Sequence, residues 1–183
     1  MRVENSFDVP APREQAWALL NDVPRVIPCM PGAELTETVD DSHWKAKLTV
    51  KLGPMSFAFA ADVAREEADA AAGRARLATS ARETKGRGSA RATIESSLSQ
   101  VDGGTRVDIV TDVNLVGPVA QYGRGMVQDV ASQLVAQFAD CLQQQLSAPG
   151  AAPPPARPVG GLRLGFGALL RAIARLVRRK ERK

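Results

Sequence analysis

The sequence has few of the residues from which many functional sites are built. It contains one histidine and two cysteines, and aromatic residues make up only 4% of the chain. Because Cys29 and Cys141 stand far apart with no CxxC pair, we expect neither a disulfide framework nor a structural zinc, and a reducing cytoplasm fits. The single His43 follows Asp41 and Ser42, but consecutive side chains of an extended strand cannot converge as a catalytic triad.

Long apolar runs are also lacking. No stretch of 18 apolar residues is free of charge, so we do not expect the chain to span a membrane. Residues 1–5 have no apolar run behind their charges, so no secretory signal is expected. No spacing of Cys, His and carboxylates predicts a metal site. Residues 86–88 (Gly-Arg-Gly) lie between expected strands and indicate a hairpin turn rather than a phosphate loop.

Charge divides the chain into two unequal parts. Residues 1–149 contain 15 Lys and Arg against 19 Asp and Glu, a net charge of −4. Residues 150–183 contain 9 Lys and Arg against one acid, a net charge of +8, and the two parts sum to the formal total of +4. We therefore expect a mildly acidic body with a strongly basic tail.

The tail has the pattern of an amphipathic helix over residues 162–183. Its apolar and basic residues fall on opposite arcs at about 100° per residue, as in a helix that lies on an anionic membrane surface. A protein partner is the alternative, and nucleic acid is disfavoured because the apolar face is as well developed as the basic one. The expected membrane-binding residues are Leu162, Phe166, Leu169, Leu170, Ile173, Leu176, Val177, Arg171, Arg175, Arg178 and Arg179.

The body shows a regular succession of elements. A first strand at residues 2–9 precedes a helix at 13–21 and a proline-rich stretch that permits only a short helical turn. Six alternating segments with turn signals between them then predict an antiparallel meander. These segments lie near residues 34–40, 43–52, 55–66, 74–84, 88–100 and 105–116.

A long helix and a linker complete the predicted order. Residues 117–146 place apolar side chains on one face of a helix that is long enough to cross a whole sheet. Residues 148–161 are rich in Pro, Gly and Ala and predict a semi-rigid spacer. The fold class is therefore α+β: a seven-stranded antiparallel sheet around a long C-terminal helix (a helix-grip fold, residues 1–147), with an apolar cavity between sheet and helix.

Candidate site residues follow from this arrangement. Rings beside small residues suit a flat apolar ligand, although an ordinary core would use the same residues. The expected cavity residues are Phe57, Phe59, Tyr122, Met126, Val130 and Leu134. The expected cavity gate consists of Pro28, Met30, Pro31, Gly32, Gly123 and Gly125, for whose two helix glycines close packing against residues 28–32 is the alternative.

Several stretches resemble known families. Residues 7–12 (Phe-Asp-Val-Pro-Ala-Pro) and 17–22 (Trp-Ala-Leu-Leu-Asn-Asp) are similar to the start of a START-like (SRPBCC) domain. Residues 26–33 (Val-Ile-Pro-Cys-Met-Pro-Gly-Ala) and 117–127, which open the last helix, resemble the CoxG family, whose description is the G subunit of carbon monoxide dehydrogenase. The resemblance covers residues 1 to about 147.

This resemblance implies a non-catalytic accessory protein that recruits a molybdenum hydroxylase of the carbon monoxide dehydrogenase type to the cytoplasmic face of the membrane, as a peripheral protein. It also implies an apolar ligand, and we expect a respiratory quinone as ligand, with no covalently bound cofactor. The expected partners are the hydroxylase, anionic lipids and the quinone, and not nucleic acid. The alternatives are a START-like cyclase or aromatase, and a membrane tether without ligand.

Overall fold

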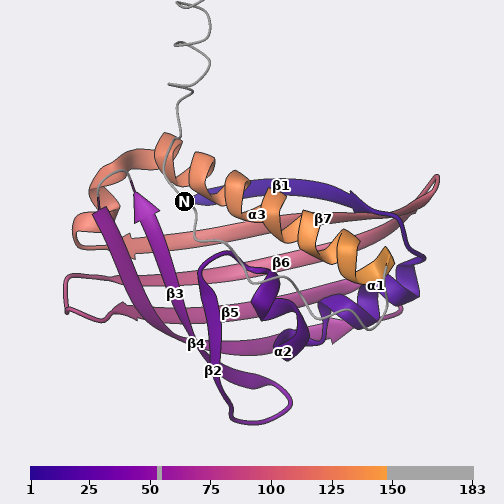
Figure 1. Ribbon diagram of the computed structural model, residues 1–183, viewed down its shortest axis with the longest axis horizontal. Coiled ribbons are helices and arrows are strands. Elements are labelled where there is room, and N and C mark those ends of the chain that lie inside the picture. The colour runs from indigo at the N-terminus through magenta and orange to yellow at the C-terminus, as the bar shows by residue number, and fades with distance from the viewer. Residues whose placement is uncertain (53–54, 148–183) are drawn as a thin grey trace, which may run out of the picture.

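The computed structural model describes residues 1–52 and 55–147 (Figure 1). The predicted linker at 148–161 and the predicted membrane helix at 162–183 lie outside the described residues. The strands are β1 (Arg2–Val9), β2 (Ala33–Thr38), β3 (His43–Leu52), β4 (Met55–Asp69), β5 (Arg74–Glu83), β6 (Ser89–Val101) and β7 (Gly104–Val116). The helices are α1 (Arg13–Leu20), α2 (Val23–Val26), η1 (Ile27–Cys29), η2 (Pro118–Tyr122) and α3 (Gly123–Ser147).

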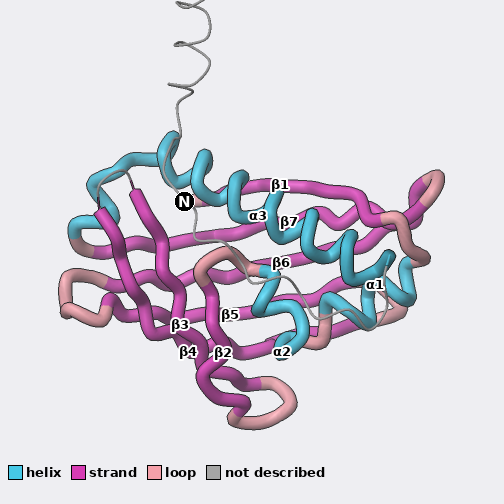
Figure 2. Tube along the Cα trace, in the orientation of Figure 1, coloured by secondary structure: helices cyan, strands magenta, loops and turns pink. Residues whose placement is uncertain are grey.

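All seven strands form one antiparallel sheet in the order β1-β7-β6-β5-β4-β3-β2. Strands β2 to β7 follow one another as a meander, and β1 pairs with the last strand, β7. The sheet curves around α3, which crosses it on one side (Figures 1 and 2). The predicted α+β helix-grip fold is therefore confirmed, with strand bounds within a few residues of those expected.

The long helix differs from its prediction at its start. Residues 118–122 form the separate short helix η2, and α3 begins only at Gly123. Gly123 has a φ of 72°, a left-handed conformation that side chains other than glycine's rarely adopt. The glycine therefore separates the two helices, so α3 sets out in its own direction and then packs along β1.

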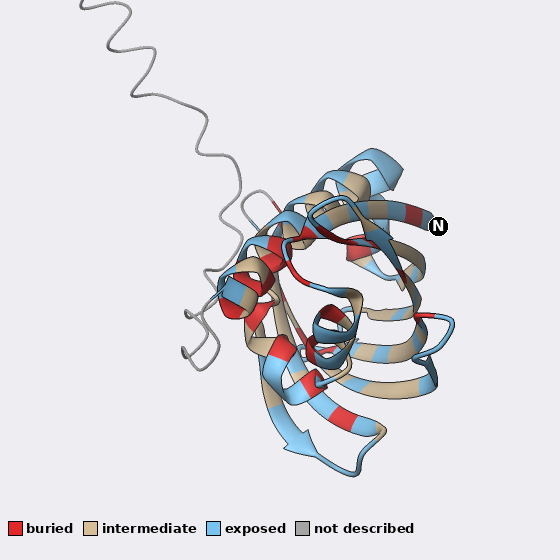
Figure 3. Ribbon diagram, turned by 90° about the vertical axis from the view of Figure 1, so that its right-hand side faces the viewer, coloured by how far each residue is buried: buried red, intermediate tan, exposed pale blue. Residues whose placement is uncertain are grey.

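Two clusters of buried side chains hold α3 against the sheet. The first, at the end of the molecule that carries α1, α2 and η1, joins ten buried residues, among them Val107 and Leu142. The second lies where α3 begins and has four buried residues: Leu52, Phe57, Phe59 and Val119. Figure 3 shows this uneven burial along the sheet and helix.

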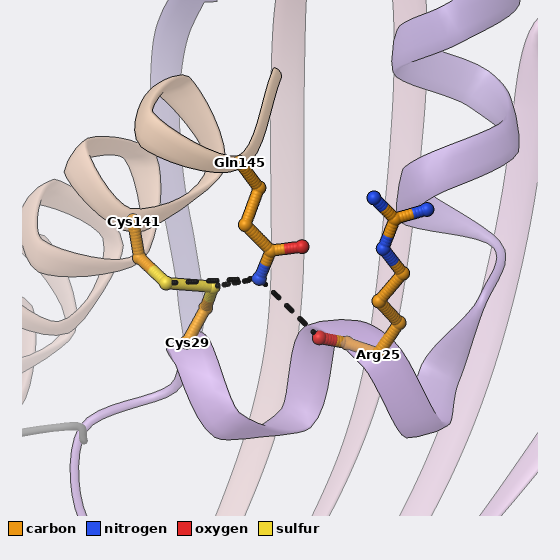
Figure 4. Close-up of a disulfide and its surroundings, with 4 residues drawn as sticks. All are labelled: Arg25, Cys29, Cys141 and Gln145. Atoms are coloured by element: carbon orange, nitrogen blue, oxygen red, sulfur yellow. Dashed lines mark hydrogen bonds between the residues drawn. A yellow bond between two sulfur atoms is a disulfide. The ribbon is translucent and has the colours of Figure 1, made fainter. Parts of the chain in front are cut away.

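The two cysteines form a disulfide, so the prediction that they stay unpaired was wrong. Cys29 in η1 and Cys141 in α3 have Cα atoms 5.4 Å apart although 112 positions separate them in sequence (Figure 4). The sequence spacing misled because folding packs η1 directly on the last turns of α3. The argument for a reducing compartment from unpaired cysteines is thereby removed.

The disulfide lies in a buried, polar-lined contact. Cys29 and Cys141 are 2% and 7% exposed, and Gln145, one turn further along α3, is 4% exposed. The Gln145 amide Nε2 lies 3.0 Å from the Cys29 sulfur and 3.5 Å from the carbonyl oxygen of Arg25. Figure 4 shows the glutamine beside the sulfur atoms, bridging α3 and α2. We call this part of the molecule, with α1, α2, η1 and the last turns of α3, the disulfide end.

Candidate functional site

The space between α3 and the middle of the sheet is not filled by either cluster. Side chains on the face of the sheet that carries Phe57 and Phe59 point towards α3, since residues alternate between faces. In the middle of that face Ala61, Thr79 and Ala92 are only half-buried and belong to neither cluster. Helix and sheet therefore do not close on each other there. We call this region, on the helix side of β4 to β6 between the two clusters, the open middle.

The six predicted cavity residues are divided between core and surface. Phe57 and Phe59 are 1% and 5% exposed and form the second cluster, with Tyr122 packed edge-on against Phe57 at 6.2 Å between ring centroids. Val130 packs against the same cluster, whereas Met126 is 41% exposed. These rings therefore form one wall at the end of the open middle, and their contact with a ligand stays a prediction.

The structure does not bring the two parts of the predicted gate together. Residues 28–32 lie at the disulfide end, since Cys29 is bonded to Cys141. Gly123 and Gly125 lie at the opposite end of α3, about 27 Å away at 1.5 Å per residue. A side chain added at either glycine would meet nothing within 4 Å, so their close packing against residues 28–32 is excluded.

An ion pair beside Phe57 was missed at the sequence level. The Glu83 side chain is only 2% exposed. It accepts hydrogen bonds from the backbone N–H of Lys85 and of Arg87, at 3.0 and 3.1 Å. The Arg87 guanidinium lies 3.3 Å from the Glu83 carboxylate and 5.7 Å from the centre of the Phe57 ring. The hydrogen bond from Arg87 lowers the pKa of Glu83, which keeps the carboxylate ionised. The spacing Glu83–Arg87 across a hairpin turn was the only signal in the sequence.

The histidine turn does bring polar side chains together, but not as a triad. Asp40, rather than Asp41, contacts His43: the distance from its Oδ1 to Nδ1 of His43 is 2.9 Å, and Ser42 Oγ lies 3.1 Å from the same nitrogen. In a triad the carboxylate and the hydroxyl contact opposite ring nitrogens. Hydrogen bonds, first from the Ser42 backbone and then from His43, lower the pKa of Asp40 to about 2. The group is an exposed turn, as the sequence indicated.

A separate hollow of about 790 Å³ crosses the sheet. Its lining includes a middle row of cross-strand partners running from Trp44 to Val113, and the two rows on either side of it point away from α3. No residue of α3 and none of the six predicted cavity residues borders this hollow. It is therefore not the predicted cavity.

Within residues 1–52 and 55–147, no group of three or more His, Cys, Asp or Glu side chains is placed to hold a metal ion. No helix in this part of the chain has both the length and the apolar character needed to cross a membrane.

The fold places the domain in the START-like, helix-grip class. A conserved protein from Geobacillus kaustophilus is similar at a TM-score of 0.72 and 20% identity, covering 80% of this chain and 95% of its own. A START superfamily protein from Mycobacterium smegmatis (TM-score 0.55, 16% identity) covers 80% and 97%. The Zhui aromatase/cyclase from Streptomyces sp. R1128 (TM-score 0.55, 17% identity) covers 80% and 93%. At these identities the likeness concerns the fold alone.

The sequence then specifies the family. The model of the CoxG family, described as the G subunit of carbon monoxide dehydrogenase, matches residues 6–147, and the chain belongs to this family. No curated protein matches the chain. Membership suggests a role accessory to a carbon monoxide dehydrogenase, and the START-like fold fits ligand binding.

Proposed function

We propose that this protein is a non-catalytic accessory factor that recruits a molybdenum hydroxylase of the carbon monoxide dehydrogenase type to the membrane. In this proposal the domain holds an isoprenoid respiratory quinone in the open middle, and the basic tail at residues 162–183 attaches the protein to anionic lipid. The enzyme's electrons then have a route to the respiratory chain. The single observation that carries the ligand part is the incomplete closure of α3 on the sheet.

The chemistry of the open middle suits a flat apolar molecule. Its half-exposed residues on the sheet, such as Ala61, Thr79 and Ala92, have small side chains. The second cluster supplies aromatic rings at one end of this space: Phe57, Phe59 and Tyr122. Apolar surface that stays half-exposed gains free energy when a ligand covers it, at about 25 cal/mol per Å². A ring system with an isoprenoid chain would provide that cover.

The same residues argue against an enzyme of the cyclase type. General acid–base catalysis needs a titratable group within reach of the substrate. Alanine and threonine offer none, and the nearby carboxylate of Glu83 is held by Arg87. The likeness to an aromatase/cyclase therefore supports the shared fold, and we assign no reaction.

Two neighbouring alanines provide a matched test of the ligand site. Ala61 points into the open middle, and Ala60, next to it on β4, points to the other face of the sheet. We expect Ala61→Phe to lose an added isoprenoid quinone, measured by quenching of intrinsic fluorescence and by mass spectrometry of organic extracts. Ala60→Phe should bind like the parent. Equal binding by both variants, or no binding by the parent, would refute the ligand site.

Flotation with liposomes tests the membrane part separately. The full chain should float with anionic liposomes, and a chain ending at Ser147 should bind them much more weakly. Equal flotation of the two chains would refute the tail assignment while leaving the ligand site intact.

A further inference from the structure

Positive charge in the body of the protein is concentrated at one end. Residues 49–57, 82–91 and 114–126 contain six Lys and Arg (Lys51, Arg82, Lys85, Arg87, Arg91 and Arg124) and one acid, Glu83. The remaining residues up to 147 contain nine Lys and Arg and eighteen Asp and Glu. The net charges are therefore +5 at this end and −9 elsewhere, within a body of net charge −4. We call the described part of these segments the basic end.

The described segments of the basic end lie together in space. They are the end of β3 with the start of β4, the β5–β6 turn, and the connection from β7 through η2 to α3, which gather at the left in Figure 1. Two contacts join them. The Tyr122 hydroxyl donates to the Met55 sulfur at 3.0 Å, and the Arg87 guanidinium lies over the Phe57 ring. The cations thus surround one surface.

The same end exposes large apolar side chains. Four such residues are exposed in the described part of the chain, and three of them, Met55 (36%), Val116 (55%) and Met126 (41%), lie at the basic end. The fourth, Val39 (51%), lies at the turn between β2 and β3, next to Asp40 and Asp41. Apolar side chains within a ring of cations fit the interface of an anionic bilayer, where basic residues meet headgroups and apolar ones enter the acyl boundary.

The acid of the basic end does not weaken this field. Glu83 is buried and is neutralised by Arg87, and its hydrogen bonds to two backbone N–H groups fix the β5–β6 turn. The carboxylate therefore orders the loop that presents Lys85 and Arg87 and adds no exposed negative charge. A surface already ordered in the free protein loses less conformational entropy when it binds.

We propose that the basic end is a membrane-docking surface that contacts anionic phospholipid directly. The proposal rests on the folded domain and holds independently of the tail and of the ligand. It orients the molecule, because the start of α3 then faces the bilayer while the disulfide end faces away. The tail begins about 37 Å further along α3, and the fourteen residues 148–161 can reach at most about 46–50 Å. Both contacts can therefore reach the same bilayer.

Site-specific quenching tests the docking directly in the full chain. Met126→Trp and Val39→Trp place an indole at two exposed sites, one at the basic end and one far from it, and the signal of the parent, with Trp17 and Trp44, is subtracted. With vesicles of phosphatidylcholine and phosphatidylglycerol that carry brominated acyl chains, we expect strong quenching for Met126→Trp and little for Val39→Trp. Vesicle binding through the tail with Met126→Trp unquenched would overturn the proposal.

Charge reversal at matched positions provides the second arm. Lys85→Glu with Arg124→Glu changes the basic end by four charges, and Arg25→Glu with Arg74→Glu makes the same change elsewhere on the exposed surface. We expect the first pair to weaken binding of the full chain to anionic vesicles by at least about tenfold, and the second pair to weaken it far less. Equal losses would show a general charge effect and refute the docking surface. Unchanged binding by both pairs would also refute it.

Discussion

The disulfide end and the basic end use their residues in opposite ways. The disulfide end buries ten residues in one cluster, adds a covalent bond between η1 and α3, and satisfies its buried polar groups internally, as Gln145 does. The basic end buries four residues and leaves Met55, Val116 and Met126 exposed among cations. One end is therefore built for cohesion and the other for contact.

The comparison teaches where a change can be tolerated. A protein of this size has a net stability of only about 5–15 kcal/mol. Concentrating burial at one end supplies that stability without closing α3 on the whole sheet. The open middle and the basic end can then keep apolar surface exposed, which a uniformly packed domain of the same length would cover.

The largest expected effect comes from removing the disulfide. Replacing Cys29 and Cys141 by Ala should lower the free energy of unfolding by about 2–5 kcal/mol, because the bond restrains a long loop of the unfolded chain. Chemical denaturation followed by circular dichroism measures this. Adding a reductant should shift the parent to the same midpoint and leave the double variant unchanged. A parent that contains two free thiols and is insensitive to reductant would contradict the comparison.

A single buried hydroxyl at the disulfide end gives an intermediate effect. Thr105 is fully buried, and its Oγ1 donates to the carbonyl oxygen of Ala11 at 2.8 Å. Thr105→Val keeps the shape but leaves that carbonyl without its donor, which should cost about 1–3 kcal/mol. Thr79→Val, in the open middle, should change the stability by less than about 0.5 kcal/mol. Similar losses for the two variants would show that burial is not concentrated as described.

The smallest effect is expected at the basic end and depends on pH. Because hydrogen bonding to Arg87 lowers the pKa of Glu83 from its ordinary value of 4.5, the folded protein holds that proton less tightly than the unfolded chain. The ion pair's stabilisation is therefore complete above pH 4.5 and is lost as the pH falls below it. Glu83→Gln should thus differ from the parent in melting temperature at pH 7 and converge with it near pH 3. A difference independent of pH would contradict the ionised pair.

Most of the fold could be predicted from local signals. Alternation and turn residues placed all seven strands, and β3 was predicted with its observed bounds, residues 43–52. These signals are local because side-chain alternation and turn chemistry act over a few residues. The break at Gly123 was missed, since a glycine near a helix start does not by itself reveal a left-handed backbone.

The site was less predictable, because it depends on contacts between distant segments. Phe57 and Tyr122 were correctly placed near each other, since strand and helix faces follow from periodicity. The pairing of Cys29 with Cys141 and the burial of Glu83 depend on how η1 and the β5–β6 turn pack, which no local pattern encodes. The same holds for the basic end, whose cations come from separate stretches of sequence.

Two glycines at the basic end couple its loops mechanically. A side chain at Gly88 would collide with the carbonyl oxygen of Val116, and one at Gly117 would collide with that of Arg87. The β5–β6 turn and the connection into η2 therefore touch backbone against backbone, like two parts of a hinge with no clearance. A bilayer pressing on the turn pushes on the segment that leads into α3, so force applied at the surface is passed along the helix towards the root of the tail.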